Sequence, residues 1–197
     1  QVDLGETFID WIENEIKRVK EGKKGRIIAK MNALVDKKII KALYKASAEG
    51  VKIDLIVRGM CCLRPGLEGV SENIQVISIV GRLLEHSRVY YFRNGGDPKV
   101  FLTSADWRPR NLDRRVEALF PVEDDELRDR LIRILEINLN DRVKARSQQS
   151  DGSYRRLTAD GGENSQLVFY NLAKQRIKKL SAQETIEKFK PKSKESE

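Results

Sequence analysis

The sequence predicts an α/β domain built on a mixed sheet flanked by helices. Apolar runs at residues 26–31 and 51–57 enclose a helical repeat at residues 34–47, an order that is typical of a parallel pair with a right-handed crossover. Two later apolar runs, at residues 89–92 and 100–103, flank the turn sequence Asn-Gly-Gly-Asp-Pro and predict an antiparallel hairpin. We therefore expect parallel and antiparallel pairing in the same fold.

The N-terminal part of the chain alternates helical and strand patterns. Residues 6–20 repeat apolar side chains at helical spacing and are followed by glycines that stop the helix. In the second helix, Asp36 lies near the start and Gly50 lies just past the end. Residues 59–73 are rich in Gly and Pro and predict a loop, which leads into a third strand at residues 74–80.

The C-terminal part predicts one more strand and two helices. Residues 116–122 have the strand pattern, and residues 124–146 form an amphipathic helix. Acidic residues at its start and basic residues at its end complement the helix dipole. The basic residues are Arg142, Lys144 and Arg146, and the apolar residues expected to face inward are Leu127, Leu131, Ile134, Leu135 and Ile137.

These patterns divide the chain into three parts. Residues 1–146 form the α/β domain, and residues 147–183 form a polar linker and a C-terminal helix that extends the domain. The linker contains a possible short strand at residues 154–157, and residues 184–197 are expected to be a disordered tail. The chain opens on a helix and has no initial Met, which indicates a domain excised from a longer protein.

The composition predicts a soluble protein in a reducing compartment, with anionic partners. The net charge is +8 and the sequence pI is near 9.5, which favours nucleotides, nucleic acid or phosphate chains, although basic charge also serves solubility alone. The two cysteines, Cys61 and Cys62, are adjacent and fit neither a disulfide framework nor a metal site, so we expect two buried thiols in the cytoplasm. No run approaches the roughly 20 apolar residues of a membrane span.

His86 is the only histidine in the chain and the first candidate for chemistry. Histidine acts as a nucleophile, base or phosphate donor near neutral pH without a large pKa shift. Arg88 lies two residues on and shares its face in an extended chain. Lys30, Asn32 and Arg58 end or follow parallel strands, at the edge where α/β sheets bind ligands. Each of these residues could equally be structural or a solvated strand end.

A second set of polar residues follows the strand at residues 100–103. If these side chains turn back toward His86, they complete a basic pocket suited to phosphoryl groups, because guanidinium binds phosphate oxygens bidentately. A carboxylate of this set, Asp106 or Glu117, could orient the imidazole. The alternative is a solvated charged loop at residues 108–115 and a core Trp107. The set comprises Ser104, Asp106, Arg110, Asn111, Arg114 and Glu117.

Three long runs carry a family resemblance: KMNALVDKKIIKALYKASAEGVKIDLIVRGMCCLRPG, GVSENIQVISIVGRLLEHSRVYYF and LTSADWRPRNLDRRVEALFPV. They resemble the C-terminal region of bacterial polyphosphate kinases. That family transfers the terminal phosphate of ATP reversibly to inorganic polyphosphate through a phosphohistidine, using magnesium. Its C-terminal half has two phospholipase D-like domains, and this chain looks like the second. The resemblance therefore implies a phospholipase D-like mixed sheet.

The resemblance also implies roles for individual residues. Arg58 and His86 would contact the phosphates of ATP or ADP, and the phosphorylated histidine would lie in the absent first domain. We expect three further residues to bind the phosphates as well: Arg88, Ser104 and Asp106. The supporting residues would be Lys30, Asn32, Arg110, Asn111, Arg114 and Glu117. His86 would then be a general acid or base, or would stabilise the leaving group. The magnesium ligands would lie outside this chain. The full enzyme would be a homo-oligomer in the cytoplasm, with association at the membrane as a further option.

Two other functions remain open from the sequence. In phospholipase D enzymes a His-x-Lys pair is followed by Ser-x-Asn, whereas this chain has His86-Ser87-Arg88 and Ser104-Ala105-Asp106, which argues against a phosphodiesterase. The other alternative is a non-catalytic module that binds polyanions independently of His86. Its binding residues would be Arg58, Arg64, Arg88, Arg108, Arg110, Arg114 and Arg115.

Overall fold

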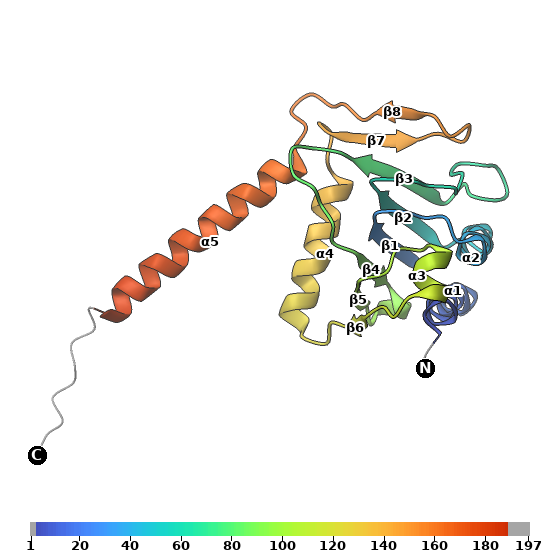
Figure 1. Ribbon diagram of the computed structural model, residues 1–197, viewed down its shortest axis with the longest axis horizontal. Helices are drawn as coiled ribbons and strands as arrows, with labels where there is room; N and C mark the ends of the chain where they lie inside the picture. The colour runs from blue at the N-terminus through green and yellow to red at the C-terminus, as the bar shows by residue number, and fades with distance from the viewer. Residues whose placement is uncertain (1–2, 189–197) are drawn as a thin grey trace, which may run out of the picture.

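A computed structural model describes residues 3–188 and shows one eight-stranded mixed sheet with helices on both faces (Figure 1). The strand order is β6-β5-β4-β1-β2-β3-β7-β8. The strands are β1 (Arg26–Met31), β2 (Lys52–Val57), β3 (Ile74–Ile79), β4 (Val89–Phe92), β5 (Lys99–Thr103), β6 (Leu119–Pro121), β7 (Ala145–Gln148) and β8 (Tyr154–Arg156). The helices are α1 (Leu4–Lys20), α2 (Lys37–Ala48), the short 3₁₀ helix η1 (Asn94–Gly96), α3 (Pro109–Arg114), α4 (Asp125–Leu139) and α5 (Ser165–Lys188).

The pairing of the strands brings their ends to a common edge. Strands β1, β2 and β3 are parallel, and Met31 pairs with Val57, so β1 and β2 end side by side. Strand β4 runs antiparallel to β1, with Lys30 opposite Val89, so the start of β4 lies at that same edge. Strands β4 and β5 form the predicted antiparallel hairpin. The predicted mixed sheet with flanking helices is therefore confirmed.

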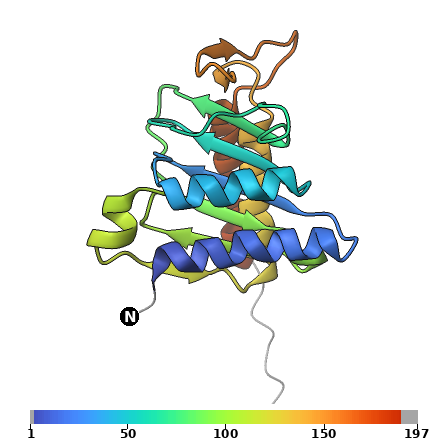
Figure 2. The same cartoon turned by 90° about the vertical axis from the view of Figure 1, so that its right-hand side faces the viewer.

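Each face of the sheet carries its own apolar layer. Helices α1 and α2 lie side by side on one face, and α4 covers the other (Figures 1 and 2). Strand β1 is central and contributes to both layers, because successive side chains point to opposite faces. Ile27 and Ala29 pack beneath the α1 and α2 layer, whereas Ile28 packs toward α4. This two-sided burial explains why β1 carries consecutive apolar residues at Ile27, Ile28 and Ala29.

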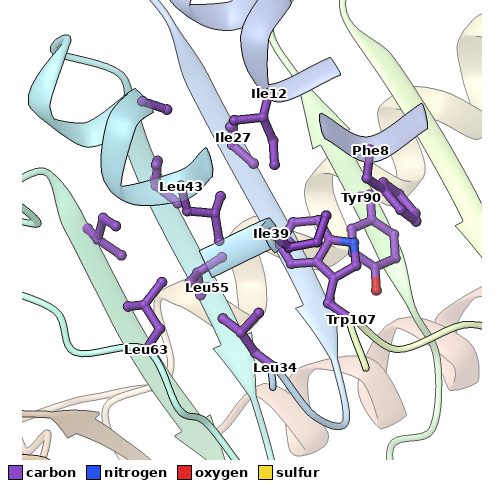
Figure 3. Packing of buried hydrophobic residues seen from close by; sticks show 14 of the residues in the cluster. Phe8, Ile12, Ile27, Leu34, Ile39, Leu43, Leu55, Leu63, Tyr90 and Trp107 are labelled. Atoms are coloured by element: carbon purple, nitrogen blue, oxygen red, sulfur yellow. The ribbon is translucent and has the colours of Figure 1, made fainter. Parts of the chain in front are cut away.

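An aromatic cluster fixes the end of β5 in the core. Trp107 is fully buried, with its ring centroid 4.9 Å from that of Tyr90 and 5.5 Å from that of Phe8 (Figure 3). Tyr90 also donates a hydrogen bond from its hydroxyl to the carbonyl of Ala105 at 3.0 Å. Trp107 is thus a core residue and not an exposed stacking platform. The backbone after β5 is consequently held in one position.

The structure corrects the predicted end of the long helix. Helix α4 ends at Leu139 and not at residue 146, so Arg142 and Lys144 lie in the following loop and Arg146 lies in β7. The charges therefore do not complement the C-terminal dipole of the helix as expected. Leu127, predicted to face inward, is 53% exposed in the first turn, because the apolar stripe meets the sheet only further along the helix.

Other corrections concern segments that the sequence describes as irregular. Residues 108–115, expected to be a loop, contain α3. This helix starts at Pro109, and proline is favourable there because the first N–H groups of a helix have no partner within it. Strand β6 covers only Leu119–Pro121 of the predicted 116–122 strand, and Val116 is 98% exposed. Cys62 is exposed and Cys61 partly buried, since both lie in the loop after β2 and not in the core.

The expected linker and tail also differ. Strand β7 runs across the predicted boundary at residue 146 and pairs with both β3 and β8. Strand β8, which matches the short strand predicted at residues 154–157, forms one edge of the main sheet. Helix α5 continues to Lys188 and extends away from the sheet (Figure 1), through part of the predicted disordered tail. The remainder of that tail lies outside the described residues. In residues 3–188, no helix is both long and apolar enough to span a bilayer.

Asp141 joins the end of α4 to the two elements that follow it. The carboxylate is fully buried, and its Oδ1 accepts N–H bonds from Val143, Lys144 and Ala145 at 2.9, 2.6 and 3.1 Å. Its Oδ2 accepts bonds from the backbone N–H and the hydroxyl of Ser165 at 2.8 and 2.7 Å. Burial raises the pKa of this carboxyl, but the hydrogen bonds outweigh burial and hold the pKa below its usual range. The Asp141 carboxylate thus binds the first residue of β7, Ala145, and the first residue of α5, Ser165.

Asp141→Ala should lower the free energy of unfolding by about 3 kcal/mol or more, because several buried N–H groups lose their acceptor. Urea denaturation at neutral pH measures this loss. The exposed Asp129→Ala in α4 is the control and should change stability by no more than about 0.5 kcal/mol. Equal stability of the two variants would show that Asp141 does not hold this junction.

Candidate functional site

Three loops are joined at the edge where β1 and β2 end. Leu34, after β1, forms parallel bridges with both Cys61 and Trp107. The Leu34 N–H donates to the Met60 carbonyl at 2.9 Å, and the Val35 N–H donates to the Trp107 carbonyl at 2.8 Å. The loops after β1, β2 and β5 therefore form one continuous rim beside the start of β4.

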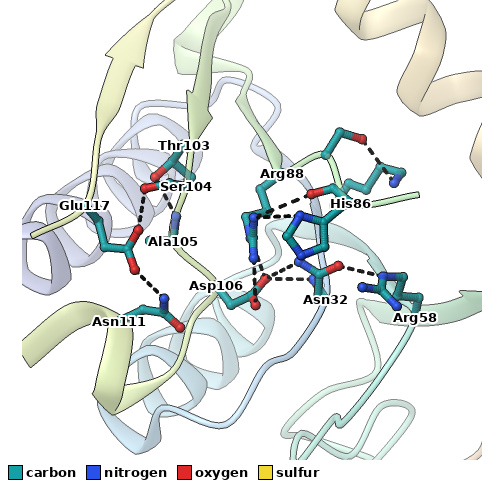
Figure 4. Close-up of polar contacts among 12 residues, drawn as sticks. Asn32, Arg58, His86, Arg88, Thr103, Ser104, Ala105, Asp106, Asn111 and Glu117 are labelled. Carbon is teal, nitrogen blue, oxygen red and sulfur yellow. Dashed lines mark hydrogen bonds and ion pairs between the residues drawn. The ribbon is translucent and has the colours of Figure 1, made fainter. Parts of the chain in front are cut away.

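Five polar residues meet on this rim, and we call them the strand-end cluster. They come from the loops after β1 and β2, the approach to β4 and the loop after β5 (Figure 4). Their sequence positions span more than 70 residues, so only the strand pairing brings them together. The strand-end cluster comprises Asn32, Arg58, His86, Arg88 and Asp106.

Asp106 is the centre of the strand-end cluster. It is 5% exposed, and its Oδ1 accepts bonds from the backbone N–H and Nδ2 of Asn32 at 2.8 and 3.0 Å and from Arg88 Nε at 2.9 Å. Its Oδ2 accepts from Arg88 Nη2 at 3.3 Å, so the guanidinium is bound bidentately. Burial raises the pKa of Asp106, but the bonds from Arg88 and Asn32 outweigh burial and bring the pKa below its usual range.

His86 is exposed and contacts Arg88. Its Nδ1 lies 3.4 Å from Arg88 Nη1, and the same Nη1 lies 3.5 Å from the His86 carbonyl oxygen. Because a guanidinium only donates, this contact favours the tautomer with an unprotonated Nδ1 and leaves Nε2 as the outward nitrogen. Asp106 therefore reaches the imidazole through Arg88, and the direct carboxylate–imidazole contact expected from the sequence is not among the described interactions.

Arg58 has hydrogen-bond donors that are not engaged by the described residues. Its Nε donates to Asn32 Oδ1 at 2.6 Å, and Asn32 is itself held by Asp106. Within the described part of the chain, the two Nη groups of Arg58 make no hydrogen bond or ion pair. The side chain is oriented at its stem while its phosphate-binding face stays available.

Lys30 lies below the rim, on the α4 face of the sheet. The side chain is 5% exposed, and its ammonium lies 3.2 Å from Glu85 Oε2 and 3.3 Å from Ser87 Oγ. Burial lowers the pKa of Lys30, and the attraction of Glu85 only partly opposes this effect. Lys30 thus binds the segment that carries His86.

The second predicted set of residues splits into two. Asp106 joins the strand-end cluster, whereas Ser104 and Asn111 both donate hydrogen bonds to Glu117. Arg110 and Arg114 are exposed on α3 and line a hollow of about 400 Å³ with Arg115. No hydrogen bond or ion pair among the described residues links this second group to His86. Glu117 therefore organises the β6 and α3 side of the rim and does not orient the imidazole.

Sequence reasoning missed Glu85 and Gln166 as parts of this site. Gln166 lies in the first turn of α5 and bonds to Leu83 and Glu85, which are 83 and 81 residues away along the chain. No local pattern marks such a contact. The signal nearest to it is Gly81, where an added Cβ would lie 2.4 Å from Gln166 Oε1.

The described residues do not form a metal site by themselves. No group of three or more His, Cys, Asp or Glu side chains suited to a metal occurs among them. The central carboxylate, Asp106, already accepts four hydrogen bonds. Asp106 is therefore already engaged by protein donors, and the location of the ligands for the magnesium that the resemblance implies stays a prediction.

Comparison with known proteins identifies relatives over most of the chain. The family described as "Polyphosphate kinase C-terminal domain 2" matches residues 1–167. The chain is 52% identical over 174 residues to a polyphosphate kinase of Halalkalibacterium halodurans, covering 87% of this chain and 25% of the relative. It is 56% identical over 165 residues to that of Pseudomonas putida, covering 84% of this chain and 23% of the relative.

A solved structure shares the fold. The crystal structure of polyphosphate kinase from Porphyromonas gingivalis matches with a TM-score of 0.85 and 44% identity, covering 89% of this chain and 27% of that protein. The chain thus spans about a quarter of the length of the relatives it matches.

The depressed pKa of Asp106 predicts a stability loss in acid. A carboxyl whose folded pKa lies below its unfolded value stabilises the fold fully above the unfolded pKa of about 3.9, and this contribution is lost as the pH falls through the folded pKa. Asp106→Asn should therefore be less stable than wild type at pH 7, with the gap closing below about pH 4. Unfolding measured from pH 7 to pH 2.5 tests this. The exposed Asp129→Asn should instead follow wild type, and a pH-independent gap for Asp106→Asn would contradict the assignment.

Proposed function

The chain belongs to the polyphosphate kinase family, and we propose that it supplies one wall of a site that transfers the terminal phosphate of ATP to polyphosphate. The observation that carries this proposal is the strand-end cluster. Arg58 in this cluster is oriented through its Nε, while its two Nη groups have no partner among the described residues. The exposed imidazole of His86 belongs to the same cluster, at the edge where the parallel strands β1 and β2 end. Phosphoryl transfer depends mainly on positioning and on charge stabilisation, and these side chains offer both.

The charges of the strand-end cluster suit a phosphate group. Arg88 is neutralised by its bidentate pair with Asp106, so it serves to place His86 more than to bind an anion. Arg58 keeps its charge unpaired and provides the phosphate-binding donors. We assign the nucleotide phosphates to Arg58 and His86, with Asn32 and Asp106 orienting both residues.

His86 acts on the leaving or attacking phosphate oxygen in this proposal. An imidazole can serve as general acid or base in phosphoryl transfer, or its protonated ring can stabilise the charge that develops. The phosphohistidine itself would form on another domain of the polypeptide, which this chain does not contain. Magnesium would be held there too, and no role assigned to this chain's residues depends on it. The full enzyme is proposed to assemble these domains, and copies of itself, in the cytoplasm.

The isolated 197-residue chain should make no polyphosphate from ATP. Half of the pocket and the phosphate-carrying histidine are missing in this proposal, and transfer requires both walls. Incubation with ATP and magnesium, followed by detection of acid-insoluble phosphate, measures this. Sustained synthesis by the purified chain would contradict the assignment of the carrier to another domain.

His86→Ala should abolish exchange of phosphate between ATP and polyphosphate when it is placed in a polypeptide that contains this chain with the remaining domains. Loss of a group that acts in the transition state should lower the rate by about a hundredfold or more. Circular dichroism should show an intact fold, because His86 is exposed. Exchange at the wild-type rate would remove His86 from the mechanism.

A second function, polyanion binding without catalysis, is favoured by one observation. Arg110 and Arg114 of α3 line one hollow together with Arg115, and His86 is not among the residues that line it. A salt titration of tripolyphosphate binding separates the two functions, because each released counterion contributes to the salt dependence of affinity. Binding weakened by His86→Ala supports the phosphotransfer wall. Binding weakened only by Arg114→Ala would favour the α3 surface.

A further inference from the structure

The segment that carries His86 has little structure of its own. Residues 80–88 connect β3 to β4 without helix or strand. In the described part of the chain, no backbone–backbone hydrogen bond reaches residues 81–87. A loop with so few internal bonds samples many conformations unless other elements hold it. The position of His86 must therefore be imposed from outside the loop.

Gln166 supplies the missing bonds. Its Oε1 accepts the Leu83 N–H at 3.0 Å, and its Nε2 donates to the Leu83 carbonyl at 2.8 Å. The side-chain amide thus pairs with one residue of the loop as a neighbouring strand would. Its Nε2 also donates to Glu85 Oε1 at 3.0 Å, one residue before His86. Gln166 itself is 9% exposed, so its side of these part-buried bonds is shielded from water.

The backbone of Gln166 is anchored to the sheet. The neighbouring Ser165 is bonded to the buried Asp141 through both its N–H and its hydroxyl. The Gln166 N–H itself donates to Asn164 Oδ1 at 3.1 Å. Gly81 permits the close approach of the amide, since a Cβ at this position would lie 2.4 Å from Gln166 Oε1. Hydrogen bonds therefore fix the backbone of Gln166, and the absence of a Cβ at Gly81 leaves room for its side-chain amide.

The opposite side of the loop is held by β1. Glu85 Oε2 lies 3.2 Å from the ammonium of Lys30, which also reaches Ser87 Oγ at 3.3 Å. The carboxylate of Glu85 thus bridges Gln166 and Lys30, and His86 lies between Glu85 and Ser87 in the chain. Contacts of the buried Lys30 with residues on both sides of His86 restrict it more than either contact alone.

We infer that Gln166 is a positioning residue that holds His86 in its productive place, so that the start of α5 takes part in the phosphotransfer site. This inference rests on the proposed function of His86. The start of α5 anchors the amide, the amide orders residues 83–85, and the strand-end cluster receives the imidazole from that ordered loop. Misplacement of a reacting group by about 1 Å costs up to a hundredfold in rate, which sets the scale of the expected effect.

The single histidine makes the test direct in the 197-residue chain. Its imidazole gives one set of NMR signals, and the Leu83 amide reports the bond to Gln166. In Gln166→Ala without ligand, we expect Leu83 hydrogen exchange to accelerate about tenfold or more and the His86 ring signal to shift toward that of a mobile residue. Binding of tripolyphosphate should weaken at least about tenfold, in line with a disordered site.

Two further variants guard against a general loss of structure. Leu167→Ala changes the next residue of α5, whose side chain is 57% exposed, and it should leave Leu83 exchange, the His86 signal and tripolyphosphate binding as in wild type. Gly81→Ala displaces the amide of Gln166 from the loop side and should reproduce the effects of Gln166→Ala. Thermal unfolding of each variant shows that the sheet remains intact.

The outcomes separate this inference from the function on which it rests. Unchanged Leu83 exchange and His86 signal in both Gln166→Ala and Gly81→Ala would overturn the positioning role, whether or not tripolyphosphate binds. Faster exchange in these variants with no effect of tripolyphosphate on the wild-type His86 signal would overturn the proposed function, and with it the catalytic purpose of the contact. Faster exchange combined with weaker binding supports both.

Discussion

The arrangement of the site depends on the buried carboxylate of Asp106. A charge in this position is unfavourable unless it is paired, and here it accepts bonds from Asn32 and Arg88 that tie the loop after β1 to the approach to β4. The residues on either side, Ala105 and Trp107, are fully buried, so Asp106 cannot turn away without removing an aromatic side chain from the core. The core of the domain therefore determines where Arg88, and with it His86, is placed.

The strand-end cluster combines a buried carboxylate, Asp106, with side chains that can reach a ligand, Arg58 and His86. Arg58 is oriented through Asn32 and keeps donors free, while His86 lies on a loop that depends on Gln166 and Lys30 for its order. Such a surface leaves donors available to a ligand or partner, as the proposed phosphotransfer wall requires. The chain spans about a quarter of the length of the relatives it matches.

Much of the fold was predictable because its patterns are local. The buried run of β1, the helical repeat of α2 and the turn between β4 and β5 each depend on nearest neighbours and turn chemistry. The errors arose where tertiary contacts overrule local pattern. The sequence of residues 124–146 has the pattern of one helix, yet Asp141 accepts the N–H groups that follow α4, and a strand begins there instead. Cys62 was expected to be buried as a small apolar side chain, but it is exposed in the loop after β2.

By itself, the sequence determined the α/β class, the basic character, the family resemblance and the candidate residues Arg58, His86, Arg88 and Asp106, because these follow from residue type and spacing. The tertiary structure alone decided which candidates meet. Asp106 joins Arg88, whereas Ser104 and Asn111 turn to Glu117, and Gln166 arrives from the start of α5. The physical reason is that a side-chain hydrogen bond acts over about 3 Å in space, and separation along the chain carries no record of which strand ends become neighbours.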